Sequence, residues 1–191
     1  MEQLEYIARD TTRSLDRDDD LALAARNDTA AFEALYVRHR SPVYRYLRTR
    51  TTDGDDAADL TALTFERAFV AIARYRPGGA GVRAWLVGIA RNASIDHGRR
   101  RLAAPRPERP PDTDEGLEAR FVADEAASEL RGRVAALPPD QRDAIVLRFA
   151  AGLTAREIGD VLGKSEAASQ KLVSRGLTAL KEAYGVRSTG R

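Results

Sequence analysis

The sequence contains no cysteine and only two histidines, His39 and His97. A chain without cysteine can form no disulfide, no thiolate metal site and no thiol nucleophile. The two histidines are far apart in the chain and form no metal-ligand motif. The sequence also lacks a secretory signal and any apolar run of about 20 residues, the length that spans a membrane. We therefore expect a soluble, cytoplasmic protein with no metal, no cofactor and no membrane insertion of its own.

The charge is balanced overall, with 31 basic and 29 acidic residues, but it is unevenly distributed. Seven basic residues and one acidic residue lie in 76–107, and eleven basic and six acidic residues lie in 130–191. Between them, residues 108–129 carry two basic and eight acidic residues. Two basic segments around an acidic one are typical of a protein with two separate nucleic-acid contacts. Solvated helix faces explain each basic segment, taken alone, equally well.

Apolar residues recur at helical spacing along most of the chain, and no strand-like alternation persists. We expect an all-α protein with two small helical domains, of which the second is a helix-turn-helix. A Pro-rich acidic stretch is expected to form a flexible linker between them. The full division is an N-terminal extension at 1–18, a first domain at 19–102, the linker at 103–117, a second domain at 118–185 and a tail at 186–191.

Local signals place three helices in the first domain. Asp28 is expected to cap the first, the acidic run 53–56 suits the start of the second, and the Gly-rich break 76–81 precedes the third. Near the end of the third helix, Asn92 and several arginines form a basic face that suits phosphate contact and base readout. The same pattern is also explained without nucleic acid, by a Trp85 that packs in the core and arginines whose charged groups lie in solvent.

The second domain carries the signals of a helix-turn-helix at 153–181. Thr154 and Glu157 have the spacing of a capping box, Gly163 suits a left-handed helix end, and Ser165 suits the cap of the next helix. In such a pair the second helix lies in the major groove of DNA. Ordinary helical packing explains the segment almost as well. The expected outward face contains Ala167, Gln170, Lys171, Ser174 and Thr178.

Four stretches together resemble the extracytoplasmic-function (ECF) group of bacterial RNA polymerase sigma factors, in the sigma-70 family. They cover most of the chain in the family's order and spacing, and the combination of the last two is highly specific. The resemblance implies sigma domains two and four joined by a linker. The stretches are AAFEALYVRHRSPVYRYLRTR at 30–50, DDAADLTALTFERAFVAIARY at 55–75, VRAWLVGIARNASIDHGRRR at 82–101 and LPPDQRDAIVLRFAAGLTAREIGDVLGKSEAASQKLVSRGLTALK at 137–181.

This resemblance implies a sigma factor that binds core RNA polymerase, recognises the −10 and −35 promoter elements and directs promoter melting and transcription initiation. Domain two is implied to dock on the clamp helices of the largest polymerase subunit through Arg48, Asp55, Asp59, Phe65 and Arg67. The loop and helix that follow are implied to read the −10 element, and glycines in the loop suit a pocket for a flipped base. The residues concerned are Arg76, Gly78, Gly79, Arg91, Asn92, Asp96, Arg99 and Arg100.

Domain four is implied to read the −35 element as duplex and to contact the polymerase flap through the helix that contains Ile145, Leu147 and Phe149. The acidic linker resembles a segment that threads toward the polymerase active centre. An anti-sigma protein that covers the polymerase-facing surfaces is a further implied partner and could hold the protein at the membrane. The implied −35 contacts are Arg156, Ser165, Glu166, Gln170, Lys171, Ser174 and Arg175.

Three residues depart from the family pattern. Leu63 stands where many members have glutamate, which bears on the clamp contact. Ser169 stands where a β-branched residue is common, and Gln170 stands where a basic residue is common. These two departures bear on the −35 sequence and on the packing of the recognition helix.

Two other classes of function fit the sequence less well. A free-standing helix-turn-helix transcription regulator would need a sensor pocket or a dimerisation helix, whereas residues 19–102 resemble the clamp-binding domain. An enzyme is disfavoured because the chain has no cysteine and no paired histidines, and because Gly78-Gly79 is not followed by the Lys-Ser/Thr of a phosphate-binding loop. We expect no catalytic residues.

Overall fold

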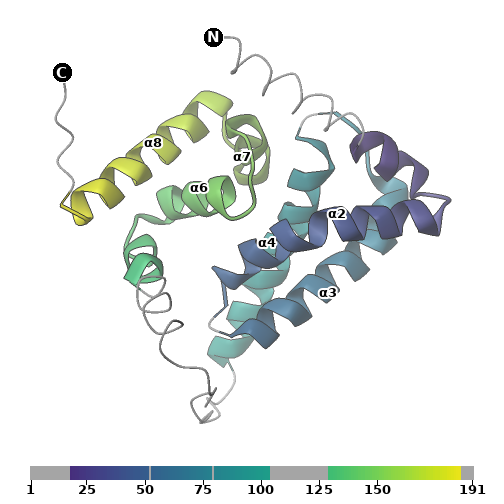
Figure 1. Cartoon of the computed structure of the whole chain (residues 1–191), viewed down its shortest axis with the longest axis horizontal. Coiled ribbons are helices and arrows are strands. Elements are labelled where there is room, and N and C mark those ends of the chain that lie inside the picture. Colours follow the sequence, from purple (N-terminus) through teal and green to yellow (C-terminus); the bar gives the residue numbers. More distant parts are fainter. Residues whose placement is uncertain (1–17, 52, 79, 104–128, 186–191) are drawn as a thin grey trace.

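The computed structural model describes residues 18–51, 53–78, 80–103 and 129–185, and within these ranges every regular element is a helix (Figure 1). The all-α prediction is therefore confirmed. Predictions for the N-terminal extension at 1–17, most of the linker, residues 118–128 and the tail at 186–191 lie outside the described residues. The elements in chain order are helical residues 18–24, α2 (Thr29–Arg48), α3 (Gly54–Ala71), the 3₁₀ turn η1 (Ile72–Arg74), α4 (Gly81–Ala103), helical residues 129–135, α6 (Pro139–Phe149), α7 (Ala155–Leu162) and α8 (Glu166–Ala183).

The helices of the first domain begin where the sequence signals place them. Asp28 caps α2 by accepting a hydrogen bond from the Ala30 backbone N–H at 2.9 Å. Asp53 caps α3 in the same way through the Asp55 N–H at 2.8 Å. A carboxylate at this position satisfies one unpaired donor and favours the positive end of the helix dipole.

The apolar faces of α2, α3 and α4 pack together into a three-helix core (Figure 1). Leu35 and Leu47 from α2, Phe65 from α3 and Leu86 from α4 are at most 4% exposed. Two edge-to-face aromatic pairs, Phe32 with Phe69 and Tyr36 with Phe65, join α2 to α3, with ring centroids 5.0 and 4.9 Å apart. The bundle presents the end of α4 and the preceding loop on its surface.

The second domain is a compact unit of α6, α7 and α8. The capping box at the start of α7 is confirmed: the Thr154 hydroxyl accepts from the Glu157 N–H, and the Glu157 carboxylate accepts from the Thr154 N–H. Gly163 ends α7 in the left-handed region with φ 66°, and Ser165 caps α8 through the Ala168 N–H at 3.2 Å. These local bonds set the sharp turn between α7 and α8.

The two domains are in contact, because α7 packs against α4 and the apolar core continues from the first bundle into the second. Leu153 and Ile158 of the second domain are fully buried in the same cluster as Val87 and Ala90 of α4. The chain that joins the domains lies outside the described residues. The surfaces that could receive DNA therefore belong to one packed arrangement of helices.

Candidate nucleic-acid interface

The first half of α8 presents the polar face that the sequence predicts. Side chains at the positions proposed for duplex contact are all exposed, and the opposite side of the helix packs on α6 and α7. Ser165 combines two features, because its hydroxyl caps the helix while the residue itself is exposed. The exposed set is Arg156, Ser165, Glu166, Gln170, Lys171, Ser174 and Arg175. The chain thus offers mixed cationic and amide donors along one helix edge.

Close packing beneath α8 explains one of the sequence departures. A Cβ atom at Gly159 would lie 2.5 Å from the Lys164 carbonyl oxygen and 3.4 Å from the Ser169 hydroxyl oxygen. Ser169 is fully buried at this crowded point, and its hydroxyl donates to the Ser165 carbonyl at 3.0 Å. Ser169 is therefore a packing residue under the turn, whereas its neighbour Gln170 is exposed.

The C-terminal half of α4 carries the second exposed basic face. Asn92, Arg99 and Arg100 are exposed, as the sequence predicts. Asp96 is also exposed and lies 3.6 Å from the Arg67 guanidinium of α3, so these two residues form an ion pair between adjacent helices. The net charge of this face is positive, which suits a phosphate backbone.

The loop between η1 and α4 is held by a short segment near the start of the described chain. The Asp19 carboxylate accepts hydrogen bonds from the Tyr75 hydroxyl and, at 3.1 Å, from the Val82 backbone N–H. Burial and the Asp19 carboxylate raise the pKa of the Tyr75 phenol well above its usual value. Arg76 and Gly78 are exposed in this loop, whereas Gly79 lies outside the described residues.

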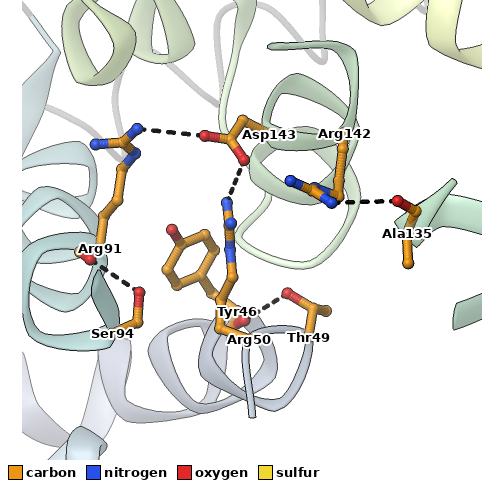
Figure 2. A network of polar contacts seen from close by, with 8 residues as sticks. All are labelled: Tyr46, Thr49, Arg50, Arg91, Ser94, Ala135, Arg142 and Asp143. Atoms are coloured by element: carbon orange, nitrogen blue, oxygen red, sulfur yellow. Dashed lines mark hydrogen bonds and ion pairs between the residues drawn. The ribbon is translucent and has the colours of Figure 1, made fainter. Parts of the chain in front are cut away.

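Arg91 differs from its neighbours because it faces the other domain. Figure 2 shows its guanidinium turned toward Asp143 of α6, at an N–O distance of 3.3 Å. The same carboxylate accepts from Arg50 at 2.7 Å, and Arg50 lies over the Tyr46 ring, 5.3 Å from its centroid. Burial raises the pKa of the Tyr46 phenol, which keeps this ring neutral beside the ion pairs. Arg91 therefore bridges domains in this arrangement instead of standing free on the basic face.

Sequence reasoning did not find Asp19, Arg50 or Asp143. Asp143 caps no helix, and although it lies in the stretch 137–181 that carries the family resemblance, its partners Arg50 and Arg91 are distant in sequence. Asp19 lies in the acidic run Asp18-Asp19-Asp20 at the expected domain boundary. That run was the one available signal, because an acidic cluster beside a helix start is often engaged as a cap.

The surface proposed for a protein partner lies on α2 and α3. Asp55, Asp59 and Arg67 are exposed and Arg48 is half-buried. Phe65 differs from these residues: its side chain is 4% exposed and packs edge-on against Tyr36, so it lies beneath this surface.

Exposed apolar side chains and a groove occur in the same region. A groove of about 340 Å³ opens between α2 and α3. Phe69 and Val70 are 51% and 78% exposed on α3. Exposed apolar groups next to a groove are typical of a protein-binding surface. The groove is lined by Tyr36, Arg40, Ser41, Tyr44, Ala58, Thr61 and Ala62.

Neither a membrane span nor a metal centre emerges from the described part of the chain. Its helices are too short or too polar to cross a bilayer. Its histidine and carboxylate side chains nowhere gather in a group of three that could hold a metal ion.

Comparison with known proteins matches both domains to one family. Residues 35–103 match the family Sigma-70 region 2, and residues 127–180 match Sigma-70, region 4. The ECF RNA polymerase sigma factor BldN of Streptomyces coelicolor is 34% identical over 82% of this chain and 61% of its own. The RNA polymerase sigma factor CarQ of Myxococcus xanthus is 31% identical over 81% of this chain and 90% of its own. The chain thus spans about three fifths of BldN and nearly all of CarQ.

Solved structures give the same fold. The structure of CnrH in complex with the cytosolic domain of CnrY aligns over 90% of this chain and 99% of the other, with a TM-score of 0.68 and 24% identity. The sigma factor RpoE in complex with the anti-sigma factor NepR from Bartonella quintana aligns over 82% and 98%, with a TM-score of 0.62 and 20% identity.

Proposed function

The chain belongs to the ECF group of the sigma-70 family, and from that premise we propose that it binds core RNA polymerase, recognises the −10 and −35 promoter elements and directs promoter melting and initiation. The observation that carries the proposal is the presence of two separate exposed basic helix faces in one chain. One lies in the region 2 match and the other in the region 4 match. Sigma factors are initiation factors that bind DNA, so we expect the chain to work through binding energy, with no bond chemistry of its own.

The end of α4 and the loop before it are the surface proposed for the −10 element. Arg99 and Arg100 would engage the phosphate backbone, while Asn92 offers an amide that pairs well with a base edge. Gly78 is exposed and adopts a positive φ of 107°, a conformation that favours glycine. Because unstacking a base costs a few kcal/mol, a pocket that receives the flipped base stabilises melted DNA.

The start of α8 is the surface proposed for the −35 element. Gln170 and Lys171 project from the first turns of the helix, where a recognition helix meets base edges. Ser165, Arg156 and Arg175 flank them and suit phosphate contact. Glu166, near the N-terminus of the helix, can accept from cytosine.

The groove between α2 and α3 is the surface proposed for the polymerase clamp helices. Tyr36 and Tyr44 are among the residues that line the groove. We assign the charged part of the contact to Asp55, Asp59 and Arg67, which are exposed on α3. In the second domain Phe149 is 61% exposed at the end of α6, whereas Ile145 and Leu147 are buried. We assign Phe149 to the flap contact and the other two to the core.

An anti-sigma protein is the partner proposed to control the chain. RpoE was solved with the anti-sigma factor NepR, and its fold is shared by this chain. An inhibitor that covers the α2–α3 groove and Phe149 would block both polymerase contacts. Full activity of the protein purified from its native cells, with no tightly bound inhibitor, would contradict this part of the proposal.

Run-off transcription tests the proposed function. Bacterial core polymerase and fragmented genomic DNA are incubated with the chain, without it, and with an Arg99→Ala, Arg100→Ala double variant. We expect discrete transcripts that require the chain and are lost with the double variant. Arg131→Ala is the matched control, because Arg131 is an exposed arginine outside both basic faces.

If no transcripts appear, a pull-down on the same core polymerase distinguishes between two causes. Binding without transcripts would point to an unsuitable promoter set. Absence of binding would contradict the proposal and favour a free-standing DNA-binding regulator.

A further inference from the structure

The loop between η1 and α4 receives its main support from a segment some 60 residues earlier in the chain. Asp19 Oδ1 accepts from the Tyr75 hydroxyl and from the Val82 N–H at 3.1 Å, while Oδ2 faces the Gly78 N–H at 3.5 Å. The Asp19 carboxylate thus faces donors at the start of the loop, in the loop itself and in the first turn of α4.

Asp19 takes the place of a local N-cap for α4. The helix starts at Gly81, and the residue before it is Ala80, so neither position has a side-chain oxygen that could accept from the first helical N–H groups. Unpaired donors at a helix start are satisfied by Ser, Thr, Asp or Asn. Asp19 supplies that acceptor from another helix, which fixes the point at which the loop joins α4.

The other end of the loop is fixed at Tyr75. Tyr75 is 5% exposed, and its ring lies against Trp85 of α4 with centroids 5.1 Å apart. The Arg26 guanidinium donates to the Tyr75 carbonyl, and the Tyr75 hydroxyl donates to Asp19. Residues 18–26 therefore hold both the backbone and the side chain of Tyr75.

The supporting segment is itself firmly attached to the first domain. Asp18 is 1% exposed and pairs with Arg38 and, at 3.2 Å, with His39 of α2. Ala22 and Ala25 lie in the apolar core. Because these residues are buried, the segment is held in place and can fix the position of the exposed loop that it contacts.

We propose that Asp19 and Arg26 are positioning residues that hold this loop in the conformation that selects a base of the melted −10 element. The inference rests on the proposed function, since it takes the loop to face melted promoter DNA. Neither residue reads the base. Asp19 is engaged by donors of the protein, and a carboxylate is repelled by the DNA backbone, so its contribution passes through the loop.

A loop ordered before binding loses less conformational freedom when the base enters. Loss of Asp19 removes two or three hydrogen bonds that define the loop. We therefore expect base discrimination at the contacted position to fall by about tenfold or more. Contacts to phosphate and to polymerase come from other residues, so overall binding should fall less than discrimination.

The experiment measures base selection by the complete holoenzyme. Core polymerase carrying the full chain binds a library of single-stranded 12-mers with six randomised central bases, and the bound fraction is sequenced. Asp19→Ala and Arg26→Ala should flatten the base preference at one or two adjacent positions. Asp19→Asn should retain most of it, because asparagine caps a helix start nearly as well as aspartate. Asp20→Ala is the matched control, since Asp20 is the exposed neighbour.

A second set of measurements separates positioning from loss of stability. Val43→Ala in the core of α2 should lower the melting temperature while keeping the base preference of the wild type. Hydrogen exchange at the Val82 amide of the free chain should accelerate in Asp19→Ala by about tenfold and remain slow in Asp20→Ala.

The outcomes separate this inference from the proposed function. A wild-type holoenzyme that selects no sequence would overturn the proposed function, and the positioning role with it. Selective wild-type binding with unchanged selection by Asp19→Ala would overturn the positioning role alone. Flattened selection in both Asp19→Ala and Val43→Ala would assign the effect to general stability and would also overturn it.

Discussion

The Asp143 carboxylate of α6 lies 3.3 Å from the Arg91 guanidinium of α4 and joins the two domains through a charged contact (Figure 2). Its other oxygen binds Arg50 at 2.7 Å, and the side chains of Asp143 and Arg50 are only 14% and 21% exposed. Removal of one partner of a partly buried pair leaves a charge without compensation. The position of the second domain therefore depends on whether Arg91 is paired with Asp143.

Asp143→Ala should loosen the packing between the domains. We expect the radius of gyration in solution scattering to increase and the unfolding free energy to fall by about 1–3 kcal/mol, since Arg50 and Arg91 lose their shared acceptor. Asp140→Ala is the matched control on the same helix, because Asp140 pairs with Lys164 inside the second domain. An unchanged radius in Asp143→Ala would show that apolar packing alone sets the arrangement.

DNA should compete with Asp143 for Arg91. An arginine that grips a phosphate leaves its carboxylate, because both partners require the same guanidinium donors. Single-stranded −10 DNA bound to the free chain should therefore increase the distance between fluorophores placed on the two domains. The increase should be absent in Arg91→Ala. Equal responses of wild type and Arg91→Ala would contradict this competition.

Gly176→Ala should destabilise the second domain even though alanine favours helices. A Cβ at this position would lie 2.7 Å from Ile145 Cγ1, so the core must shift. Overpacking of this kind costs about 1–3 kcal/mol. Chemical denaturation should show that loss, and the double variant with Ile145→Ala should lose less than the sum of the two single changes.

A second glycine provides the control for that experiment. Gly98 also lies inside a helix, but a Cβ there meets nothing within 4 Å. Gly98→Ala should raise stability by about 0.5–1 kcal/mol through helix propensity alone. Destabilisation by both alanines would contradict the role given to Ile145.

The sequence predicts the features that depend on residues close together in the chain. The caps at Asp28, Thr154 and Ser165 depend on residues three positions apart or fewer, and all three are confirmed. The exposed stripe of α8 follows from helical periodicity. In contrast, Asp19 and Asp143 act on residues more than 50 positions away, and no local pattern encodes such contacts.

Helical spacing does not tell which apolar residues of one stripe are buried. Phe65 and Phe69 lie one turn apart on α3, yet they are 4% and 51% exposed. Spacing alone cannot distinguish the two, because burial depends on where α2 crosses. The family resemblance, which assigns Phe65 to the polymerase contact, likewise carries no information on its burial.

Acid should weaken the attachment of the N-terminal segment. Burial alone would raise the pKa of Asp18, but hydrogen bonds and charges from His39 and Arg38 lower it below its usual value. A lowered folded pKa contributes stability that is complete above the unfolded pKa of about 3.9 and is lost as pH falls through the folded value. Asp18→Asn should therefore lower the urea concentration at the midpoint of unfolding, relative to the wild type, clearly at pH 6 and less at pH 3. An equal difference at both pH values would contradict this linkage.

Lys171→Ala combined with Arg175→Ala should weaken binding to duplex −35 DNA and spare the affinity for core polymerase. Both side chains are exposed on α8, away from the surfaces assigned to the polymerase. Each phosphate contact that is lost should reduce the slope of log affinity against log salt by about 1. Fluorescence anisotropy at several salt concentrations measures both quantities. Lys181→Ala, at the far end of the same helix, is the matched control and should retain the wild-type slope. Equal losses of DNA and polymerase affinity in the double variant would contradict the assignment of this face to DNA.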